Sequence, residues 1–583
     1  MLFSRIGGAV SRRIARHISP ALCAALLGAS SFCAGSQAVA AAEMSCEELA
    51  SVVIATNRIS LPTSGASITS AETVDSPMTG EYCQVQGEIK PVDITAPAIK
   101  FQVNLPQEWN DRSILFGGSG MNGVLATGTT PLPPMPLMNR WPVAEGFVTY
   151  GSDSGHQAGP ALSRDGSFMA NDEALRNYSG DALKKTHDVA MQLVDARYGK
   201  APIARYVIGG STGGREALIA VSRWPAEFQG ALVFYPAWNL TAQNLHRGVI
   251  TQQMAKPGAY PSKAKRTLLY DAAIEACDGL DGLKDGIISN QARCDKTFDP
   301  ASATVNGKRL RCSPGETNID SCLTEDELDS FMTMNDPVQF MYTRCDSGSS
   351  YPGLTTWGTD FGRTSGSQFE ELVTMLTLGM VAPAYPMPPV QDPMSPPHAA
   401  TFWDEWVRYA VTRDPSFNSL TLDPKEPREW QSRIIELRLL QDVDPTKLAA
   451  FEQHGGKILI AHGVHDGTVS NRATQDLVTQ VTESLGETRT RNLLRYYEIP
   501  GYGHAFSTSF NAEWNALPVL MAWAEQGQAP GPQVIQDIVG PSAGRTRPLC
   551  EYPTWPKYTG GDVNRASSFT CVEVSDDDGA VAR

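Results

Sequence analysis

Short apolar runs alternate with glycine turns and longer amphipathic stretches near both ends of the chain. Apolar runs of strand length lie at 98–105, 113–117, 147–155, 206–209 and 229–237. A helical stretch at about 172–198 precedes the fourth run, and a second helix follows that run directly through a tight glycine turn. Strands, turns and helices in this alternation favour an α/β fold with a mostly parallel sheet.

The alternation stops after Trp238 and resumes beyond Asp442. The segment between them is rich in Pro, Gly, Trp and Cys, and contains the run PAYPMPPVQDPMSPP. The pattern then returns as a strand at 455–467, a helix near 471–485, a strand at 493–504 and a helix near 513–526. We therefore expect a single sheet domain made of 41–238 and 443–583, with an inserted domain at 239–442.

The first forty residues have the features of a secretory signal peptide, assigned to 1–40. Arg5, Arg12, Arg13 and Arg16 precede the short apolar run ALCAALLGASSFCAG, which ends near the small-residue site AVA. The run is shorter than the roughly 20 apolar residues of a membrane span, and Gly and Ser interrupt it. The protein is therefore expected to be secreted or periplasmic. The SRR sequence leaves both the general and the twin-arginine export routes open.

Composition narrows the class of protein. The 583 residues are 42% hydrophobic and 19% charged, which excludes a coiled coil and a wholly disordered chain. A net charge of −15 argues against nucleic-acid binding. No later segment is long and apolar enough for a membrane span. No feature of the sequence specifies an oligomeric state.

The cysteines suggest disulfide-closed local loops. Of 11 cysteines, two lie within the predicted signal peptide. Eight of the others fall into neighbouring pairs, with Cys345 left over: Cys46/Cys83, Cys277/Cys294, Cys312/Cys322 and Cys550/Cys571. Such loops suit an oxidising compartment. Buried thiols or zinc ligands are the alternative, but no C-x-x-C or Cys/His cluster supports it.

The motif Gly209-Gly210-Ser211-Thr212-Gly213 lies between an apolar strand and a helix. A G-x-S-x-G turn in that setting holds a serine on a sharp bend with its hydroxyl exposed. The N–H of the following residue, Thr212, then points at the oxyanion that develops during acyl transfer. A second oxyanion donor is expected from the early glycine turn, in the stretch Gly118-Ser119-Gly120, with Ser119 and Gly120 as the selected candidates.

A catalytic acid and a histidine follow the serine in the order that this fold requires. Asp466 comes after the strand KILIAHG and His504 after the strand RYYEIPG, where parallel sheets gather their ligands. We expect His504 to exchange a proton with Ser211 and Asp466 to orient the imidazole. An alternative interpretation treats His462, His465 and Asp466 as a metal cluster, although no further ligand motif stands near them.

Three carboxylates separated by glycines lie in CDGLDGLKDGII, at Asp278, Asp281 and Asp285. They repel one another unless they are solvated or bridged by a cation, and oxygen ligands of this kind suit Ca²⁺. The spacing is not that of an EF-hand. From spacing alone, a solvated acidic loop is an equally good interpretation, and the flanking Cys277 and Cys294 favour a closed, rigid site.

Over nearly all of the chain after the signal peptide, these motifs resemble those of the tannase/feruloyl esterase family. The similarity lies in GGSTGGREAL, HGVHDGTVS, PGYGHAF and the acidic loop. The resemblance implies an α/β-hydrolase fold with a large inserted lid domain and Ser211, Asp466 and His504 as catalytic residues. It also implies a structural Ca²⁺ in the lid, held by Asp278, Asp281, Asp285 and the carbonyls of Leu283 and Ile287.

The chain departs from this resemblance beside the catalytic residues. Family members usually join a cysteine before the serine to one after the histidine, but Gly210 and Ala505 stand at those positions here. Packing and hydrogen bonds must then hold the site without a constraint that is typically worth about 2–4 kcal/mol. We expect a looser site and an altered substrate preference with activity retained.

The expected function is that of a serine carboxylic-ester hydrolase acting on small-molecule aromatic esters of the feruloyl, galloyl or terephthalate-monoester type. Two alternatives are a general esterase for aliphatic or polymer-derived esters and a non-catalytic calcium-dependent binding protein. Several lid side chains are alternative candidates for substrate contacts, although core packing or a surface salt bridge is the more ordinary role: Trp403, Trp406, Phe417, Arg408 and Arg413.

Overall fold

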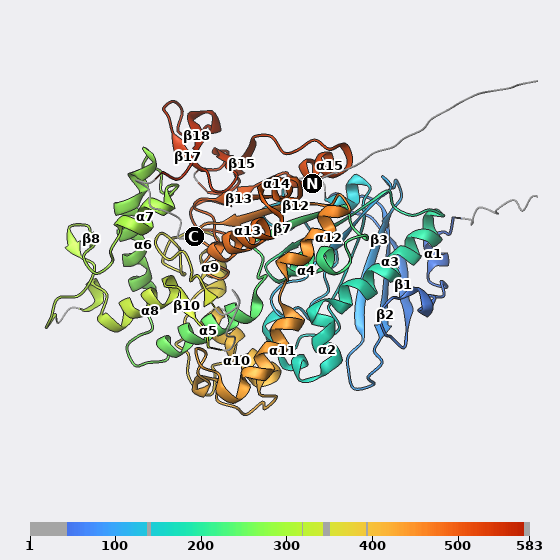
Figure 1. Cartoon of the computed structure of the whole chain (residues 1–583), viewed down its shortest axis with the longest axis horizontal. Helices are drawn as coiled ribbons and strands as arrows, with labels where there is room; N and C mark the ends of the chain where they lie inside the picture. The colour runs from blue at the N-terminus through green and yellow to red at the C-terminus, as the bar shows by residue number, and fades with distance from the viewer. Residues whose placement is uncertain are drawn as a thin grey trace, which may run out of the picture. The chain divides into compact units, whose positions relative to one another are not determined.

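A nine-stranded sheet positions the other elements of the chain (Figure 1). Its strand order is β1-β2-β3-β5-β4-β6-β7-β12-β13. The strands from β5 to β13 run parallel, whereas β1, β2 and β3 are antiparallel to their neighbours. The bounds are Gly65–Val74 (β1), Tyr82–Lys90 (β2), Ile99–Pro106 (β3), Arg112–Phe116 (β4), Val148–Ser152 (β5), Ala204–Gly210 (β6), Gly230–Phe234 (β7), Lys457–Gly463 (β12) and Leu494–Ile499 (β13).

The computed structural model describes 43–136, 141–316, 319–341, 350–391, 394–540 and 542–575. The predicted signal peptide at 1–40 and the unpaired Cys345 lie outside these residues. Within the described part of the chain, no helix has the length and apolar character needed to cross a membrane.

Alternate residues of the central strands pack into two apolar cores, one on each face of the sheet. On β12, Ile458 and Ile460 belong to one core, whereas Leu459 and Ala461 belong to the other. This period of two is the geometry of an extended strand whose faces are both covered. The first core is completed by α3 (Ala182–Tyr198), α4 (Thr212–Arg223) and α13 (Asn471–Leu485), and the second by α15 (Ala516–Gln526).

Between β7 and β12 the chain leaves the sheet and forms helices with cores of their own. In Figure 1 the helices α5 to α10 lie together in the left and lower parts of the view. The helices of this segment are α5 (Leu240–Met254), α6 (Lys263–Cys277), α7 (Gln291–Thr297), α8 (Glu325–Asn335), α9 (Glu370–Leu376), α10 (His398–Glu405), α11 (Gln431–Gln441) and α12 (Leu448–Gln453). After β13, short hairpins built from β14 (Ala512–Glu513), β15 (Gln533–Asp537), β16 (Thr546–Leu549), β17 (Trp555–Tyr558) and β18 (Phe569–Val572) complete the described chain.

The structure confirms the α/β class and adds two features to the expected pattern. The helix expected at about 172–198 is divided into α2 (Asp172–Arg176) and α3 by a π-helical turn, in which Gly180 has a φ of 131°. The hairpin of β1 and β2 was not expected, because partly exposed polar residues alternate along β1 and leave no apolar run.

The four disulfides are the four pairs expected from proximity along the sequence. Cys46–Cys83 joins α1 (Cys46–Leu49) to β2, and Cys277–Cys294 joins the end of α6 to α7. Cys312–Cys322 and Cys550–Cys571 close loops with separations of 10 and 21 residues.

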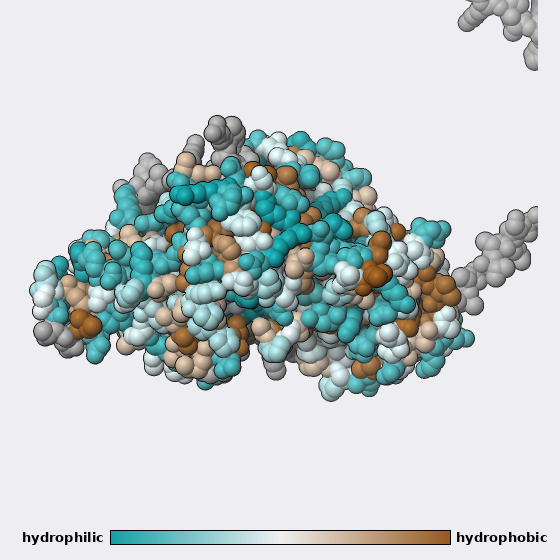
Figure 2. All heavy atoms as spheres, turned by 90° about the horizontal axis from the view of Figure 1, so that it is seen from below, coloured by the Kyte–Doolittle hydropathy of each residue, from teal (hydrophilic) through white to brown (hydrophobic). Residues whose placement is uncertain are grey.

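The face of the molecule seen in Figure 2 is mostly hydrophilic, with apolar residues scattered over it in small groups. This matches the packing of the long apolar runs into the cores on the two faces of the sheet. Single exposed apolar residues are ordinary on a protein surface and do not indicate a binding face.

Replacing Cys46 and Cys83 together by serine should lower the free energy of unfolding by about 2–4 kcal/mol, because the crosslink closes a long loop in the unfolded chain. Urea unfolding followed by circular dichroism, compared between the wild-type protein and the double variant, measures this difference. An unchanged unfolding free energy would mean that α1 is already held by packing alone.

Candidate active site

Ser211 occupies the sharp turn between β6 and α4. Its φ of 58° and ψ of −121° are unusual for a residue with a side chain, and such strain is maintained by the packing around it. The turn brings backbone so close that a Cβ atom on Gly209 would collide with the carbonyl of Gly213. Glycine is therefore required at position 209, as the sequence motif predicts. The turn leaves Thr212 as the first residue of α4.

The early glycine turn packs directly on this bend. A Cβ atom on Gly117 would lie 2.7 Å from the Cα of Gly213, so the two turns touch backbone to backbone. The Thr212 hydroxyl donates a hydrogen bond of 2.5 Å to the Gly120 carbonyl and ties the turns together. The candidate oxyanion donors Thr212, Ser119 and Gly120 are thus brought into one neighbourhood.

Glu216, one and a half turns along α4, holds the early glycine turn in place. Its carboxylate accepts hydrogen bonds from the Gly118 N–H at 2.8 Å and the Asn122 amide at 2.6 Å. Because the Gly118 N–H already donates to Glu216, Ser119 and Gly120 remain the candidates for the second oxyanion donor. Burial raises the pKa of the Glu216 carboxyl, while the Arg215 charge and these hydrogen bonds oppose that shift.

Asp466 and His504 meet at the carboxyl edge of the sheet, beyond β12 and β13. The His504 Nδ1 and the Asp466 Oδ2 are 2.7 Å apart, and the other carboxylate oxygen accepts from the N–H groups of Thr468 and Val469 at 2.8 Å. Burial opposes the charge on Asp466, but the nearby His504 and hydrogen bonds from His462 and His504 hold the pKa of the carboxyl below its usual value. Asp466 is therefore an anion that fixes the ring of His504.

Tyr235 connects the serine turn to the histidine. Its ring centroid lies 4.7 Å from that of His504, and its hydroxyl donates to the Pro133 carbonyl at 2.7 Å. A Cβ atom on Gly210 would lie 2.8 Å from the Tyr235 ring, so the glycine before Ser211 is needed to admit the ring. This contact could not be predicted from the sequence, because Tyr235 lies in no recognisable motif.

Gly210, the residue before Ser211, and His504 thus both pack against the ring of Tyr235. Within the described residues, the Ser211 hydroxyl forms no hydrogen bond with the His504 ring. Catalytic hydrogen bonds often tighten after substrate binds, so the role of Ser211 in a triad stays a prediction.

A cavity adjoins His504 and lies between the loops at the edge of the sheet and the inserted segment. On the sheet side it is lined by His465 and the loop after β13, which includes Phe506. Leu376 and Thr377 of the inserted segment line the other side. The cavity therefore offers a place where an apolar group can reach the imidazole.

The alternative metal cluster of His462, His465 and Asp466 is not supported by the geometry of these side chains. The ring nitrogens of His462 bond with the Thr474 hydroxyl at 2.9 Å and with Asp466 at 3.2 Å. His465 contacts Gln291 through Nε2, and its Nδ1 accepts from the Gly501 N–H. Protein groups already use the nitrogens that a metal would need.

The acidic loop folds into a compact turn, in which the carboxylate oxygens of Asp278, Asp281 and Asp285 do not all lie within 4.8 Å of one another. Asp278 accepts from the N–H groups of Asp285, Gly286 and Ile287. Burial raises the pKa of Asp281 to about 6, and the negative charges of Asp285 and Asp278 add to that effect. The Asp281 Oδ2 is buried and has no hydrogen-bond partner among the described residues.

This donor set fits a hard cation. A buried carboxylate oxygen without a partner, next to two other carboxylates, is the arrangement that Ca²⁺ neutralises. Asp285 is also an ion-pair partner of Arg547, and Arg545 lies 3.8 Å from the same oxygen, so β16 supplies part of the counter-charge. Leu283 and Ile287, the predicted carbonyl ligands, lie within the same turn.

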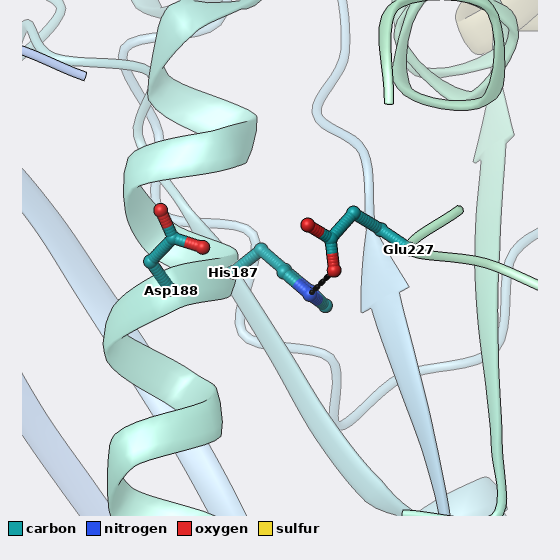
Figure 3. Close-up of side chains that lie close together, drawn as sticks. All are labelled: His187, Asp188 and Glu227. Atoms are coloured by element: carbon teal, nitrogen blue, oxygen red, sulfur yellow. Dashed lines mark ion pairs between the residues drawn. The ribbon is translucent and has the colours of Figure 1, made fainter. Parts of the chain in front are cut away.

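A second group of acidic and imidazole side chains, His187, Asp188 and Glu227, lies on α3 and beside β7 (Figure 3). Its counter-ion is Lys184, whose ammonium contacts Asp188 and Glu227 at 2.7 Å each. His187 completes the cluster by bonding with the Tyr150 hydroxyl at 2.7 Å and Glu227 at 3.3 Å. Lysine thus holds the position that a metal would take.

The lid side chains named as alternative candidates for substrate contacts have ordinary structural roles. Trp403 and Trp406 are buried in the core of the inserted segment, and Phe417 packs against Trp430. Arg408 pairs with Asp404 at 3.0 Å, and Arg413 pairs with Asp172.

The model of a family described as tannase and feruloyl esterase matches residues 83–572. An uncharacterized esterase of Agrobacterium fabrum is 36% identical, over 91% of this chain and 93% of its own length. Mono(2-hydroxyethyl) terephthalate hydrolase of Piscinibacter sakaiensis is 27% identical, over 84% of this chain and 85% of its own.

Solved structures share the fold. Feruloyl esterase B from Aspergillus oryzae superposes with a TM-score of 0.68 at 19% identity, covering 91% of this chain and all of that chain (100%). Tannin acyl hydrolase from Aspergillus niger gives 0.64 at 18% identity, covering 89% and 94%. The fold is therefore of the α/β-hydrolase type found in these esterases.

Substituting Glu216 by alanine should lower kcat for an ester substrate by about 10–100-fold, with a smaller change in KM, because the loop that carries Ser119 and Gly120 loses its anchor. Steady-state hydrolysis of p-nitrophenyl butyrate measures both constants.

Glu173→Ala is the matched control for Glu216→Ala. Glu173 is also buried and accepts from two backbone N–H groups, those of Val92 and Asp93, but on the far loop between β2 and β3. The Glu173→Ala variant should be less stable than the wild-type protein and should retain its kcat. Equal loss of kcat in both variants would show that destabilisation alone explains the effect of Glu216.

Proposed function

This chain belongs to the tannase and feruloyl esterase family, and on that premise we propose that it is a serine esterase for aromatic acids. It is a carboxylic ester hydrolase, and the proposal adds the nucleophile, the mechanism and the acyl group. The observation that supports it best is the 2.7 Å contact of the His504 Nδ1 with Asp466. Tyr235 packs against His504, and Ser211 occupies a strained turn.

The proposed reaction begins when the Ser211 hydroxyl attacks the ester carbonyl and His504 takes its proton. The N–H groups of Thr212 and of Ser119 or Gly120 stabilise the oxyanion. The protonated imidazole, held by Asp466, then gives its proton to the leaving alcohol, and an acyl-serine remains. His504 next deprotonates a water molecule that attacks the acyl carbon, and Ser211 recovers its proton as the acid leaves.

The aromatic acyl preference is supported by the relatives and by the cavity beside His504. Phe506 and Leu376 give this cavity apolar surface, which suits the ring of an aromatic acid. The relatives act, by their names, on feruloyl and terephthalate esters. A general esterase for aliphatic esters is the competing proposal, and the acyl preference discriminates between the two.

We also propose that the segment 239–442 acts as a lid and carries one structural Ca²⁺. The carboxylates of Asp278, Asp281 and Asp285 and the carbonyls of Leu283 and Ile287 would hold it. Bound there, the ion would neutralise the three carboxylates, and it would take no part in the reaction. The disulfides are consistent with secretion through the signal peptide predicted at 1–40.

The esterase proposal predicts that Ser211→Ala removes turnover of methyl ferulate, methyl gallate and mono(2-hydroxyethyl) terephthalate alike. Removal of a nucleophile from a triad costs several orders of magnitude in kcat, roughly 10⁴-fold or more. Release of the acid, followed by liquid chromatography, measures it. Turnover of p-nitrophenyl butyrate without any aromatic ester would favour the general esterase, and turnover by the variant at the wild-type rate would contradict Ser211 as nucleophile.

The calcium proposal predicts that chelation lowers the free energy of unfolding by about 2–4 kcal/mol, because the ion stabilises the folded state by mass action. Thermal unfolding after treatment with a chelator should recover on addition of Ca²⁺ but not of Mg²⁺, which requires a tighter octahedral site. Asp281→Asn should abolish the response to Ca²⁺. A melting temperature that does not depend on Ca²⁺ would identify the loop as a solvated acidic turn.

A further inference from the structure

Gly166 lies between the inserted segment and the early glycine turn. A Cβ atom on Gly166 would lie 2.8 Å from the Cβ of Glu405 and 3.1 Å from the Sδ of Met121, and both distances are shorter than an ordinary van der Waals contact. Glu405 is the last residue of α10, and Met121 directly follows Ser119 and Gly120, the candidates for the second oxyanion donor. One glycine therefore touches the inserted segment on one side and the early glycine turn on the other.

Hydrogen bonds join this part of the chain to the inserted segment. The Gly166 N–H donates to the Glu405 Oε2 at 2.8 Å, and the Arg164 guanidinium donates to the Met375 carbonyl at 3.0 Å. Burial raises the pKa of the Glu405 carboxyl to about 7, while the Gly166 N–H and the Arg408 charge oppose that shift. An ionised and a protonated carboxyl both have an oxygen that accepts an N–H, so the bond with Gly166 forms in either state.

The same short segment, 163–166, holds the backbone of the early glycine turn. The Met121 N–H donates to the Ser163 carbonyl at 2.6 Å. A Cβ atom on Gly120 would lie 2.4 Å from that carbonyl oxygen, so the Gly120 backbone packs directly against it. The segment 163–166 therefore forms a continuous connection from Glu405 to the residues beside the oxyanion donors.

Most N–H groups of the turn 117–123 are already used within the protein. Those that donate to protein oxygens belong to Gly117, Gly118, Met121, Asn122 and Gly123. Among the residues that the structure describes, the N–H groups of Ser119 and Gly120 have no acceptor, as oxyanion donors require. The bond of Met121 with Ser163 comes directly after this pair, so a displacement of Ser163 would change the direction of the two N–H groups. Oxyanion stabilisation depends on donors that are fixed before the reaction.

We infer that Glu405 is a positioning residue, through which the inserted segment fixes the N–H groups of Ser119 and Gly120 for catalysis. Glu216 holds the same turn from α4, by its bond with the Gly118 N–H, and Glu405 holds it from the inserted segment. The inserted segment then acts on the transition state without touching the reacting atoms. This inference rests on the proposed esterase function and adds a role of the inserted segment in it.

Removing the acceptor tests this role. In Glu405→Ala the Gly166 N–H loses its partner, and we expect kcat for p-nitrophenyl butyrate to fall by about 10-fold, with KM within about twofold of the wild-type value. Glu405→Gln keeps an oxygen that accepts the same N–H, so its kcat should return to within about threefold of wild type. Gly166→Ala keeps the acceptor but inserts a methyl group between Glu405 and Met121, and it should lower kcat in the same way.

A tetrahedral inhibitor separates positioning from general destabilisation. Phenylboronic acid adds to an activated serine, and one oxygen of the adduct takes the place of the oxyanion. Its inhibition constant should rise by about 10-fold in Glu405→Ala, in step with the loss of kcat, because both depend on the same donors.

Glu327→Ala is the matched control. Glu327 is another buried carboxylate of the inserted segment, accepts the Thr324 N–H at 2.9 Å and pairs with Lys265 at 3.1 Å, but it has no hydrogen bond with the segment 163–166. The Glu327→Ala variant should be less stable than the wild-type protein and should retain both its kcat and its inhibition constant for phenylboronic acid.

Each result has a distinct meaning. Wild-type kcat and inhibition in Glu405→Ala, equal losses in Glu405→Ala and Glu327→Ala, or a Glu405→Gln variant as impaired as Glu405→Ala would overturn the positioning role and leave the esterase function standing. A wild-type protein that cleaves neither p-nitrophenyl butyrate nor any ester of the aromatic panel would instead overturn the proposed function itself.

Discussion

The contact between two glycine turns at the carboxyl edge of the sheet is the constraint on which the site depends. Gly117 and Gly213 touch backbone to backbone, and this contact is possible only without side chains on either residue. It fixes Ser211 in a strained conformation and places Thr212 and Gly120 within hydrogen-bond distance. Glu216 then anchors the Gly118 N–H from the following turn of α4. The turn of Ser211 and the loop with the candidate oxyanion donors are therefore positioned by the same contact.

The charged groups near this bend hold the imidazole of His504 in one orientation. Asp466 is a buried anion whose four hydrogen-bond donors leave it no freedom to turn, and His504 takes its orientation from it. The Tyr235 ring packs against the same imidazole, with 4.7 Å between the ring centroids.

Much of this arrangement could be predicted from local sequence. The strands and helices around Ser211, Asp466 and His504 followed from apolar runs and glycine turns, since their signals lie within a few residues of one another. The disulfides followed from proximity because each closes a local loop. The roles of Tyr235 and Glu216 could not be predicted, because each depends on residues far away in the chain. Glu216 lies within the serine motif, but its partner Gly118 is 98 positions distant.

The central claim is that Ser211 is a nucleophile activated by His504, and covalent labelling tests it most directly. A fluorophosphonate probe forms a stable phosphoserine-like adduct with an activated serine and ignores ordinary hydroxyl groups. Mass spectrometry of the digested protein should locate one adduct, on the peptide that contains Ser211, and His504→Ala should slow its formation by at least about 100-fold. An adduct on another residue, or equal labelling in the variant, would contradict the account.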